Sequence, residues 1–200
     1  STFVIETDEN SGNENPTEAT TEAPSQPNQP DKDGYYFHDT FETDSNGWEG
    51  RGSSDTELSG RSPYKDTNAL LVKNRESAWN GVQKPLDTAT FKAGQEYSFS
   101  VCAAYLDGTS ETNEFVLSLC YNDSSGETKF RRIAAATAVK GKYVQLSNTN
   151  YKLPEGSDFI IYVETSNGTD NFYIDEAIAA KTGTKIEGPV GIKVPASLIY

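Results

Sequence analysis

The stretch DFIIYVE at 158–164 is predicted to be a β-strand, whose two-residue period divides its side chains between two distinct faces. One face carries Phe159, Ile161 and Val163, and the other carries Ile160, Tyr162 and Glu164. The first face is suited to a core. The second places an aromatic ring beside a carboxylate on an outward surface, where both are available to a ligand.

The same alternation recurs in short segments along the chain, at spacings of roughly 8–15 residues, and no segment keeps a helical period. The segments that we predict as strands are 35–43, 69–74, 77–86, 97–106, 113–122, 128–139, 141–154, 158–164 and 170–180. About nine to eleven short strands separated by turns rich in Gly, Asn and Asp predict an all-β fold, a jelly-roll β-sandwich of two antiparallel sheets.

The clearest predicted hairpin joins 97–106 to 113–122. The inward positions are Phe99, Val101, Ala103 and Tyr105 on the first strand, and Phe115, Leu117, Leu119 and Tyr121 on the second. A turn near residue 111 would bring these two sets opposite each other. It would also place Cys102 opposite Cys120 on the outward side. A strained cross-strand disulfide is one interpretation, and free thiols are the one we favour, because the fold has ample core without a covalent link.

Composition divides the chain into three parts. Residues 1–33 hold four prolines, many Thr, Glu and Asn, and eight acidic side chains against one basic side chain. Such a stretch buries too little apolar surface to fold, so we interpret it as a Pro/Thr/Glu-rich linker. Residues 34–180 form the predicted sandwich module. Residues 181–200 are again broken by Gly and Pro and are interpreted as a C-terminal linker segment, with docking on the sandwich as the alternative.

Charge and residue counts exclude several classes of function. A formal net charge of −13 and a pI near 4.5 argue against nucleic acid and anionic membranes as partners, since both require a basic surface. No run of 18 apolar residues is present that could cross a membrane. Two Cys and one His do not provide a zinc site of thiolates and imidazoles. The N-terminus lacks the features of a signal peptide, so we interpret the chain as a piece of a longer mature, extracellular protein.

Trp79 lies in the polar stretch SAWNG at 77–81, where a core tryptophan would be unusual. An outward Trp, Tyr and Glu on β-strands are typical of sugar-binding surfaces, because rings stack on pyranose faces and carboxylates accept hydrogen bonds from hydroxyls. The alternative is that Trp79 and Tyr162 are packing residues whose polar tips reach water.

Five segments in order give the chain a resemblance to a known family. FETDSNGWEGRG, SAWNGVQKPL, FRRIA, YVE and NFYIDEA resemble family 22 carbohydrate-binding modules over roughly residues 35–180. The resemblance implies a jelly-roll sandwich with a concave binding face, found beside xylanases and related plant cell-wall-degrading enzymes. It also implies binding of xylan or xylo-oligosaccharides, with mixed-linkage β-glucan as a possible ligand, and a structural calcium.

The resemblance assigns roles residue by residue. Trp79 matches the family's stacking tryptophan, Tyr162 and Glu164 match the tyrosine and glutamate of the cleft, and Arg51 matches the arginine after the first strand. Phe130 stands where the family has a further tyrosine. Phenylalanine keeps the stacking face but loses the phenolic hydroxyl, which puts affinity or glycan preference in question. Alternation in KFRRIA points Phe130 and Arg132 away from Ile133, and a core position for Phe130 is the alternative.

For calcium, the resemblance implies a site near the junction of the first and last strands. The implied ligands are the carboxylates of Glu42 and Asp175 and the carbonyls of Thr40 and of the turn around Lys65. Oxygen ligands suit Ca²⁺, and extracellular fluid supplies it. From the residues alone, both carboxylates could equally be solvated surface groups.

Three function classes remain open. The first is a non-catalytic carbohydrate-binding module of a secreted bacterial enzyme, monomeric and attached to catalytic or cellulosomal modules. The second is a jelly-roll glycoside hydrolase, which would need two carboxylates about 5–9 Å apart across a cleft, whereas only Glu164 can be placed. The third is a structural or interaction sandwich without a ligand. The combination of Trp79, Tyr162 and Glu164 favours the first.

Overall fold

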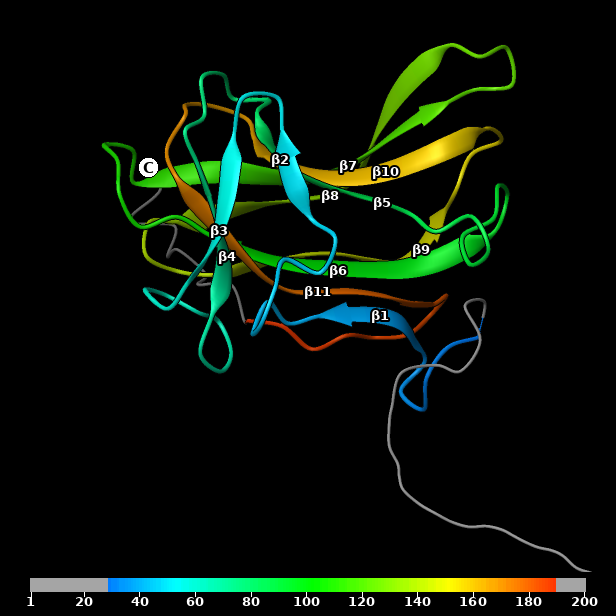
Figure 1. The fold of residues 1–200 in the computed structure, drawn as a ribbon, viewed down its shortest axis with the longest axis horizontal. Helices are drawn as coiled ribbons and strands as arrows, with labels where there is room; N and C mark the ends of the chain where they lie inside the picture. Colours follow the sequence, from blue (N-terminus) through cyan, green and yellow to red (C-terminus); the bar gives the residue numbers. More distant parts are fainter. Residues whose placement is uncertain (1–28, 190–200) are drawn as a thin grey trace, which may run out of the picture.

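Alternating apolar and polar residues build eleven strands in the part of the chain that the structure, a computed structural model, describes, residues 29–189 (Figure 1). They are β1 (Tyr35–Asp39), β2 (Glu49–Arg51), β3 (Asp55–Ser59), β4 (Ala69–Lys73), β5 (Gly81–Pro85), β6 (Glu96–Ala104), β7 (Thr112–Asn122), β8 (Thr128–Val139), β9 (Val144–Lys152), β10 (Ser157–Thr165) and β11 (Phe172–Lys181). No helix occurs among these described residues, and so none that could cross a membrane.

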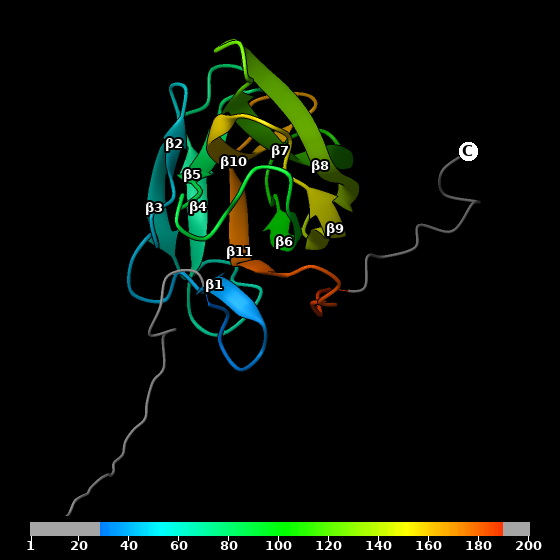
Figure 2. The ribbon, with the colours of Figure 1, turned by 90° about the vertical axis from the view of Figure 1, so that its right-hand side faces the viewer.

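The strands form two antiparallel sheets that pack face to face, as the jelly-roll prediction requires. One sheet has the order β3-β4-β11-β6-β9, with β1 also paired to β11, and the other has the order β2-β5-β10-β7-β8. Figure 2 views the sandwich from its end, with β10, β7 and β8 above β11, β6 and β9. The all-β sandwich prediction is confirmed.

The predicted hairpin between 97–106 and 113–122 is wrong. Strand β6 pairs with β11 and β9, whereas β7 pairs with β10 and β8, so the two strands belong to different sheets. Their predicted inward residues are nevertheless all buried. The two sets face each other across the core instead of lying side by side within one sheet, and alternation alone does not distinguish these arrangements.

The cysteines lie on the outer faces of the two sheets. Cys102 is opposite Gln145 and Asp175, and Cys120 is opposite Ile160 and Phe130. Both are free thiols, as favoured from the sequence, and their predicted cross-strand juxtaposition is wrong. Burial raises the pKa of Cys102 to about 12, so this thiol stays protonated at neutral pH.

The first predicted strand ends earlier than the sequence indicated. Strand β1 stops at Asp39, and the chain then bends at Phe41, whose φ of 59° is left-handed and whose side chain is fully buried. Asp39 accepts hydrogen bonds from Trp48 Nε1 at 2.9 Å and Lys84 Nζ at 2.5 Å. These contacts fix the connection between β1 and β2 beneath the five-stranded sheet, and they give the chain's other tryptophan a structural role.

The proposed linkers fall largely outside the described residues. Positions 1–28 and 190–200 lie outside them, so the predicted N-terminal linker and most of the C-terminal one stay predictions. Between 182 and 189 the chain follows the six-stranded sheet. Ile186 is buried against Ile178 and Ala180, and the carbonyl of Ile186 accepts a hydrogen bond from Gln145 Nε2 at 2.8 Å. Ordered packing of the sandwich module therefore continues past the predicted boundary at 180.

Candidate functional site

The outward face of the five-stranded sheet forms the floor of an open groove, which we call the sheet groove. Strand register places one row of polar and aromatic side chains across it: Glu49, Gln83, Tyr162, Ser118 and Arg132. The groove has a volume of about 400 Å³. Its lining includes Trp79, Ser118, Phe130, Arg132, Tyr162 and Glu164. Four of the five predicted carbohydrate-binding residues therefore line one groove.

Two features rise above this floor. In Figure 1 the end of the β7–β8 hairpin stands up at one side, and the loop between β4 and β5, residues 74–80, stands up at the other. Phe130 comes from the hairpin, and Trp79 comes from the loop. The sequence predicted a strand over 77–86 that would include Trp79. In the structure Trp79 lies instead in the loop that precedes β5. Its ring faces the groove from one wall, and Phe130 lines it from the other.

Trp79 and Phe130 are the exposed large hydrophobic residues of the described part of the chain. Their relative exposures are 55% and 59%, while Ile133 on the same strand as Phe130 is buried at 5%. The core alternatives for Trp79 and Phe130 are therefore wrong. Exposed aromatic rings that share a groove with polar groups mark a surface suited to a ligand.

Strand β10 supplies the centre of the floor, and its alternation is confirmed: Phe159, Ile161 and Val163 are all in the core. Tyr162 faces the groove, yet it exposes only 5% of its surface. The cover is Arg51, whose guanidinium carbon lies 3.9 Å from the centroid of the Tyr162 ring. Arg51 Nη1 donates to Gln83 Oε1 at 2.8 Å, which holds the guanidinium plane over the ring. Arg51, the fifth predicted residue, thus joins the site by stacking on Tyr162.

Glu164 is the carboxylate of the floor. It is partly buried, and this desolvation raises its pKa, while the guanidinium groups of Arg51, Arg75 and Arg132 act in the opposite direction. Water solvates this carboxylate incompletely, and arginines surround it. It can therefore act as a fixed hydrogen-bond acceptor for sugar hydroxyls. Glu49, at the β2 end of the row, is a second carboxylate on this face; it does not line the 400 Å³ volume, and it accepts a hydrogen bond from Gln83 Nε2 at 3.1 Å.

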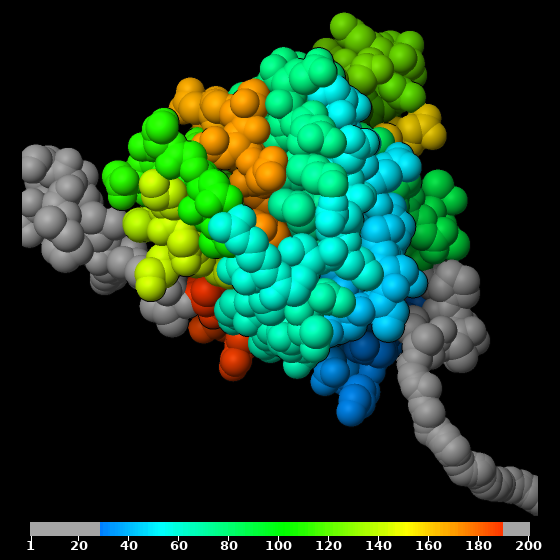
Figure 3. All heavy atoms as spheres, turned by 60° about the vertical axis from the view of Figure 1, so that its left-hand side comes forward, coloured from blue at the N-terminus to red at the C-terminus, as the bar shows by residue number. Residues whose placement is uncertain are grey.

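The wall that carries Trp79 is held by Arg75, which sequence reasoning did not identify. Its side chain is buried at 6% exposure, and it donates to the carbonyls of Ala78 and Asn80 within the loop, both at 2.7 Å. It also donates to the Asp170 carbonyl and the Thr165 hydroxyl, both at 2.6 Å. Figure 3 shows the chain around 165–171 packed directly against residues 74–80. Arg75 therefore ties the Trp79 loop to strand β10 and the segment after it.

Close backbone approach completes this wall. Gly52 has a φ of +73°, and a Cβ placed there would lie 2.9 Å from Trp79 Cζ3 and 2.2 Å from Asn80 Nδ2. The glycine therefore makes room for the indole ring. Asn80 is buried, and its side-chain carbonyl accepts from the backbone N–H groups of Glu76 and Ser77, both at 2.8 Å.

The residues that were missed gave little signal in the sequence. Arg75 lies in the string KNRESAWN, where a charged side chain is normally solvated. Gln83 and Ser118 join the site only because β5 and β7 flank Tyr162 on β10. Alternation along 81–85 could have placed Gln83 on an outward face, but its neighbours depend on strand order.

The implied metal ligands Glu42 and Asp175 contact the same turn, 64–68, from two sides. Asp175 Oδ2 accepts from the N–H groups of Tyr64 at 2.9 Å and Lys65 at 3.1 Å. Glu42, which lies in the loop after β1 and not on a strand, accepts from the N–H groups of Thr67 and Asn68, both at 3.0 Å. Thr40 lies two residues before Glu42.

Asp175 is fully buried, no ion pair joins it to a cation among residues 29–189, and its burial raises its pKa to about 6. Within residues 29–189, no group of three or more His, Cys, Asp or Glu side chains suitable for a metal ion is found. A cation here would therefore need backbone carbonyls beside the two carboxylates. Carboxylates with carbonyls are a donor set that suits Ca²⁺, so these residues fit the implied ion.

Comparison with known proteins adds relatives to this geometry. A family described as a carbohydrate-binding domain matches residues 33–170. Endo-1,4-beta-xylanase Y of Acetivibrio thermocellus is 47% identical over 161 residues, and a xylanase/beta-glucanase of Ruminococcus flavefaciens is 38% identical over 161 residues. Each match covers 80% of this chain but only 15% and 20% of the respective relative. The chain thus corresponds to a small part of these curated relatives.

Among solved structures, the C-terminal family 22 carbohydrate-binding module of Clostridium thermocellum Xyn10B has a TM-score of 0.77 and 44% sequence identity. The match covers 78% of this chain and 100% of that module. A structure described as a xylan-binding domain of family 22 gives a TM-score of 0.76 with 44% identity, again over 78% of this chain and 100% of the other.

Proposed function

The chain belongs to family 22 of the carbohydrate-binding modules, and we propose that its sheet groove binds the backbone of xylan. The observation that carries the proposal is the pair of exposed rings, Trp79 and Phe130, in a groove whose floor holds Tyr162 and Glu164. Exposed rings stack on pyranose faces, and the carboxylate accepts hydrogen bonds from ring hydroxyls. The relative with a TM-score of 0.76 and 44% identity is described as xylan-binding, which supports the same ligand here.

Binding without turnover follows from the same lining. A glycoside hydrolase needs two carboxylates across its cleft. Glu164 is the one carboxylate among the described residues that line the 400 Å³ volume, and arginines surround it. Glu49, at the β2 end of the floor, already accepts a hydrogen bond from Gln83. We assign Glu164 to hydrogen bonding, in agreement with a family of binding modules. A mixed-linkage β-glucan is a second candidate ligand, because one relative of 38% identity is named a xylanase/beta-glucanase.

The module's role in its polypeptide is to hold an appended enzyme near plant cell wall. The curated relatives that it matches are several times longer and are named as xylanases. One further relative is a family 22 module joined to a family 10 glycoside hydrolase and complexed with xylohexaose, with a TM-score of 0.66 and 26% identity. We place the protein outside a bacterial cell, as a monomeric module beside a xylan-degrading or cellulosomal partner in the same chain.

Calcium has a structural role in this proposal. Glu42 and Asp175 would hold the ion with carbonyls of Thr40 and Lys65, and the bound ion would supply positive charge to a buried carboxylate. All four residues lie in the connection after β1, in the turn at 64–68 or on β11 of the six-stranded sheet. The sheet groove lies on the outward face of the other sheet, so the ion would stabilise the fold without contacting sugar.

Calorimetric titration with xylohexaose and cellohexaose tests the proposed ligand. We expect the protein to bind xylohexaose, to bind cellohexaose more weakly, and to release no shorter sugars. Trp79→Ala should abolish binding and leave the free energy of unfolding within about 1 kcal/mol, because the ring is exposed. Trp79→Phe is the matched control, since it keeps a stacking ring and should retain measurable binding. Unchanged affinity in Trp79→Ala would show that the sheet groove is not the site.

A further inference from the structure

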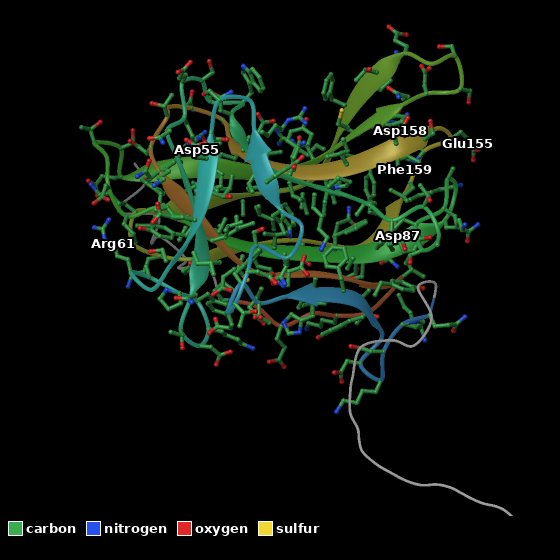
Figure 4. The ribbon with its side chains drawn as sticks, in the orientation of Figure 1. Asp55, Arg61, Asp87, Glu155, Asp158 and Phe159 are labelled. Atoms are coloured by element: carbon green, nitrogen blue, oxygen red, sulfur yellow. The ribbon has the colours of Figure 1, made fainter. Side chains whose placement is uncertain are left out.

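A second hollow lies on the other side of the hairpin that carries Phe130. It has a volume of about 790 Å³ and lies between the β7–β8 hairpin and residues 152–155, which are the last residue of β9 and the three that follow it. We call it the hairpin hollow. Figure 4 labels Glu155 at the same end of the sandwich as this hairpin. Phe130 and Arg131 line both the hairpin hollow and the sheet groove. Phe130 lies on the outward face of β8 with Cys120, and Arg131 lies on the core face with Leu119, so the two spaces adjoin across the edge strand β8.

The hairpin hollow gathers cations on a strongly acidic chain. Lys129, Arg131 and Lys152 line it, against the acidic Asp123 and Glu155. The whole chain has 17 Lys and Arg against 30 Asp and Glu, so this local excess of cations is a departure from the overall balance. An anionic ligand would be repelled by most of this protein's surface and attracted here.

The two central cations are available to a ligand. Within residues 29–189, neither Arg131 nor Lys152 takes part in an ion pair. The Arg131 guanidinium carbon lies 5.7 Å from the centroid of the Tyr121 ring, which supports the side chain without neutralising it. Among the acids, Asp123 already accepts three hydrogen bonds from Ser125 and Glu127 in the hairpin turn. That carboxylate is committed to the turn.

We propose that the hairpin hollow receives a carboxylate-bearing branch, a uronic acid, of the glycan whose backbone occupies the sheet groove. This inference rests on the proposed function. A backbone ring against Phe130 would lie beside the edge strand β8, so a branch from that ring would reach the hollow around this edge. There the Arg131 guanidinium, which presents parallel N–H donors, and the Lys152 ammonium pair with the carboxylate. Pro154, which is partly exposed, supplies an apolar surface for the branch ring.

Two ligands with one backbone test this inference. The full chain is titrated with a neutral xylo-oligosaccharide and with the same oligosaccharide carrying one uronic acid branch. Exposed charge pairs contribute little each, so we expect the branched ligand to bind about three- to tenfold more tightly. The preference should decline towards one as NaCl is raised to about 0.5 M, because salt screens exposed charges.

Charge reversal at Lys152 locates the effect, because Lys152 lies outside the sheet groove. Lys152→Glu should remove the preference or reverse it, and should leave the affinity for the neutral ligand within twofold. Lys142→Glu is the matched control: it makes the same change of charge in the turn between β8 and β9, outside both spaces, and should keep the preference. The Lys152→Glu protein is checked by its melting temperature.

Three results would overturn the inference. The first is equal affinity of the native protein for the neutral and the branched ligand. The second is a preference for the branched ligand that persists in the Lys152→Glu protein. The third is an equal loss of this preference in the Lys142→Glu protein, which would show that only the overall charge of the protein matters. These results leave xylan binding in place. If neither ligand binds, the proposed function is wrong, and the proposed site for the branch is then wrong as well.

Discussion

Arg75 gives the sharpest test of how the fold positions the binding surface. The change is Arg75→Lys, which keeps the positive charge but replaces a planar group of five donors with one ammonium. In the native protein Arg75 donates to three carbonyls and one hydroxyl at 2.6–2.7 Å, and its side chain is buried. Its burial also lowers the pKa of Arg75 to about 10, so the group remains charged at neutral pH.

The magnitude follows from the groups that would lose their donors. A buried carbonyl without a partner costs about 1–3 kcal/mol, and lysine can serve only part of the four acceptors. We expect Arg75→Lys to lower the free energy of unfolding by about 3–5 kcal/mol, within the range for breaking buried charged networks. In a domain of this size each kcal/mol corresponds to roughly 2–4 °C, so the melting temperature should fall by roughly 10 °C or more.

The same change should weaken sugar binding, because the anchored loop carries Trp79. If the loop keeps its native position about one tenth of the time, the apparent affinity falls about tenfold. The assays are calorimetric unfolding and titration with xylohexaose at 25 °C. Indole fluorescence adds a direct readout, since Trp48 is buried and Trp79 is the exposed one of the chain's two tryptophans.

Arg61→Lys is the matched control, because Arg61 pairs with Asp107 at an exposed position and its replacement should change stability by less than about 0.5 kcal/mol. An Arg75→Lys protein with the native melting temperature would refute the claim that the four hydrogen bonds of Arg75 stabilise the fold. A protein with lowered melting temperature but native affinity and native accessibility of Trp79 to acrylamide would refute the positioning role.

Three further predictions concern the groove and the metal site. Glu164→Gln should weaken xylohexaose binding about tenfold by removing a charge-assisted acceptor. Burial raises the folded-state pKa of Glu164, so the charged carboxylate destabilises the fold at pH values above that pKa. The Glu164→Gln protein should therefore have a higher melting temperature than the native protein at neutral pH. This difference in melting temperature should vanish as the pH falls through the folded-state pKa. Melting curves from pH 4 to 8 check the sign, and a gain that grows on acidification contradicts it. A chelator should lower the melting temperature, because it removes an ion held by Glu42 and Asp175. It should leave the affinity for xylohexaose at 25 °C unchanged. An unchanged melting temperature would count against a bound calcium. Phe130→Tyr should keep the melting temperature and retain or improve affinity, because the ring is 59% exposed and its added hydroxyl meets water; destabilisation would contradict that exposure.

The sequence alone determined which face of each long strand is buried. Period-two alternation identified Phe159, Ile161 and Val163 as core residues, and it identified both inward sets of β6 and β7. It also placed Tyr162 and Glu164 on the outward face of their strand, and it placed Phe130 on the face of its strand that points away from Ile133. The reason is physical: successive side chains of a strand point to opposite sides, so a local pattern is enough to separate the core from the surface.

Strand partners were decided only by the tertiary structure. Alternation is the same for two strands of a hairpin and for two strands that face each other across a sandwich, so β6 and β7 were wrongly paired. The row that crosses the floor likewise depends on β10 lying between β5 and β7, which brings Gln83 and Ser118 beside Tyr162. No local signal in the sequence reports a neighbour that comes from a distant segment.

The walls of the site show the same division. Polar surroundings and an aromatic ring made Trp79 a candidate, but the loop conformation that holds it depends on Arg75 reaching Thr165 and Asp170, about 90 residues away along the chain. A buried arginine and a solvated one look alike in a sequence, because burial is decided by what packs around the side chain. Trp79, Tyr162 and Glu164 were therefore recognisable from their chemistry. Long-range contacts determined where they lie and brought the missed residues Arg75, Gln83 and Ser118 to the site.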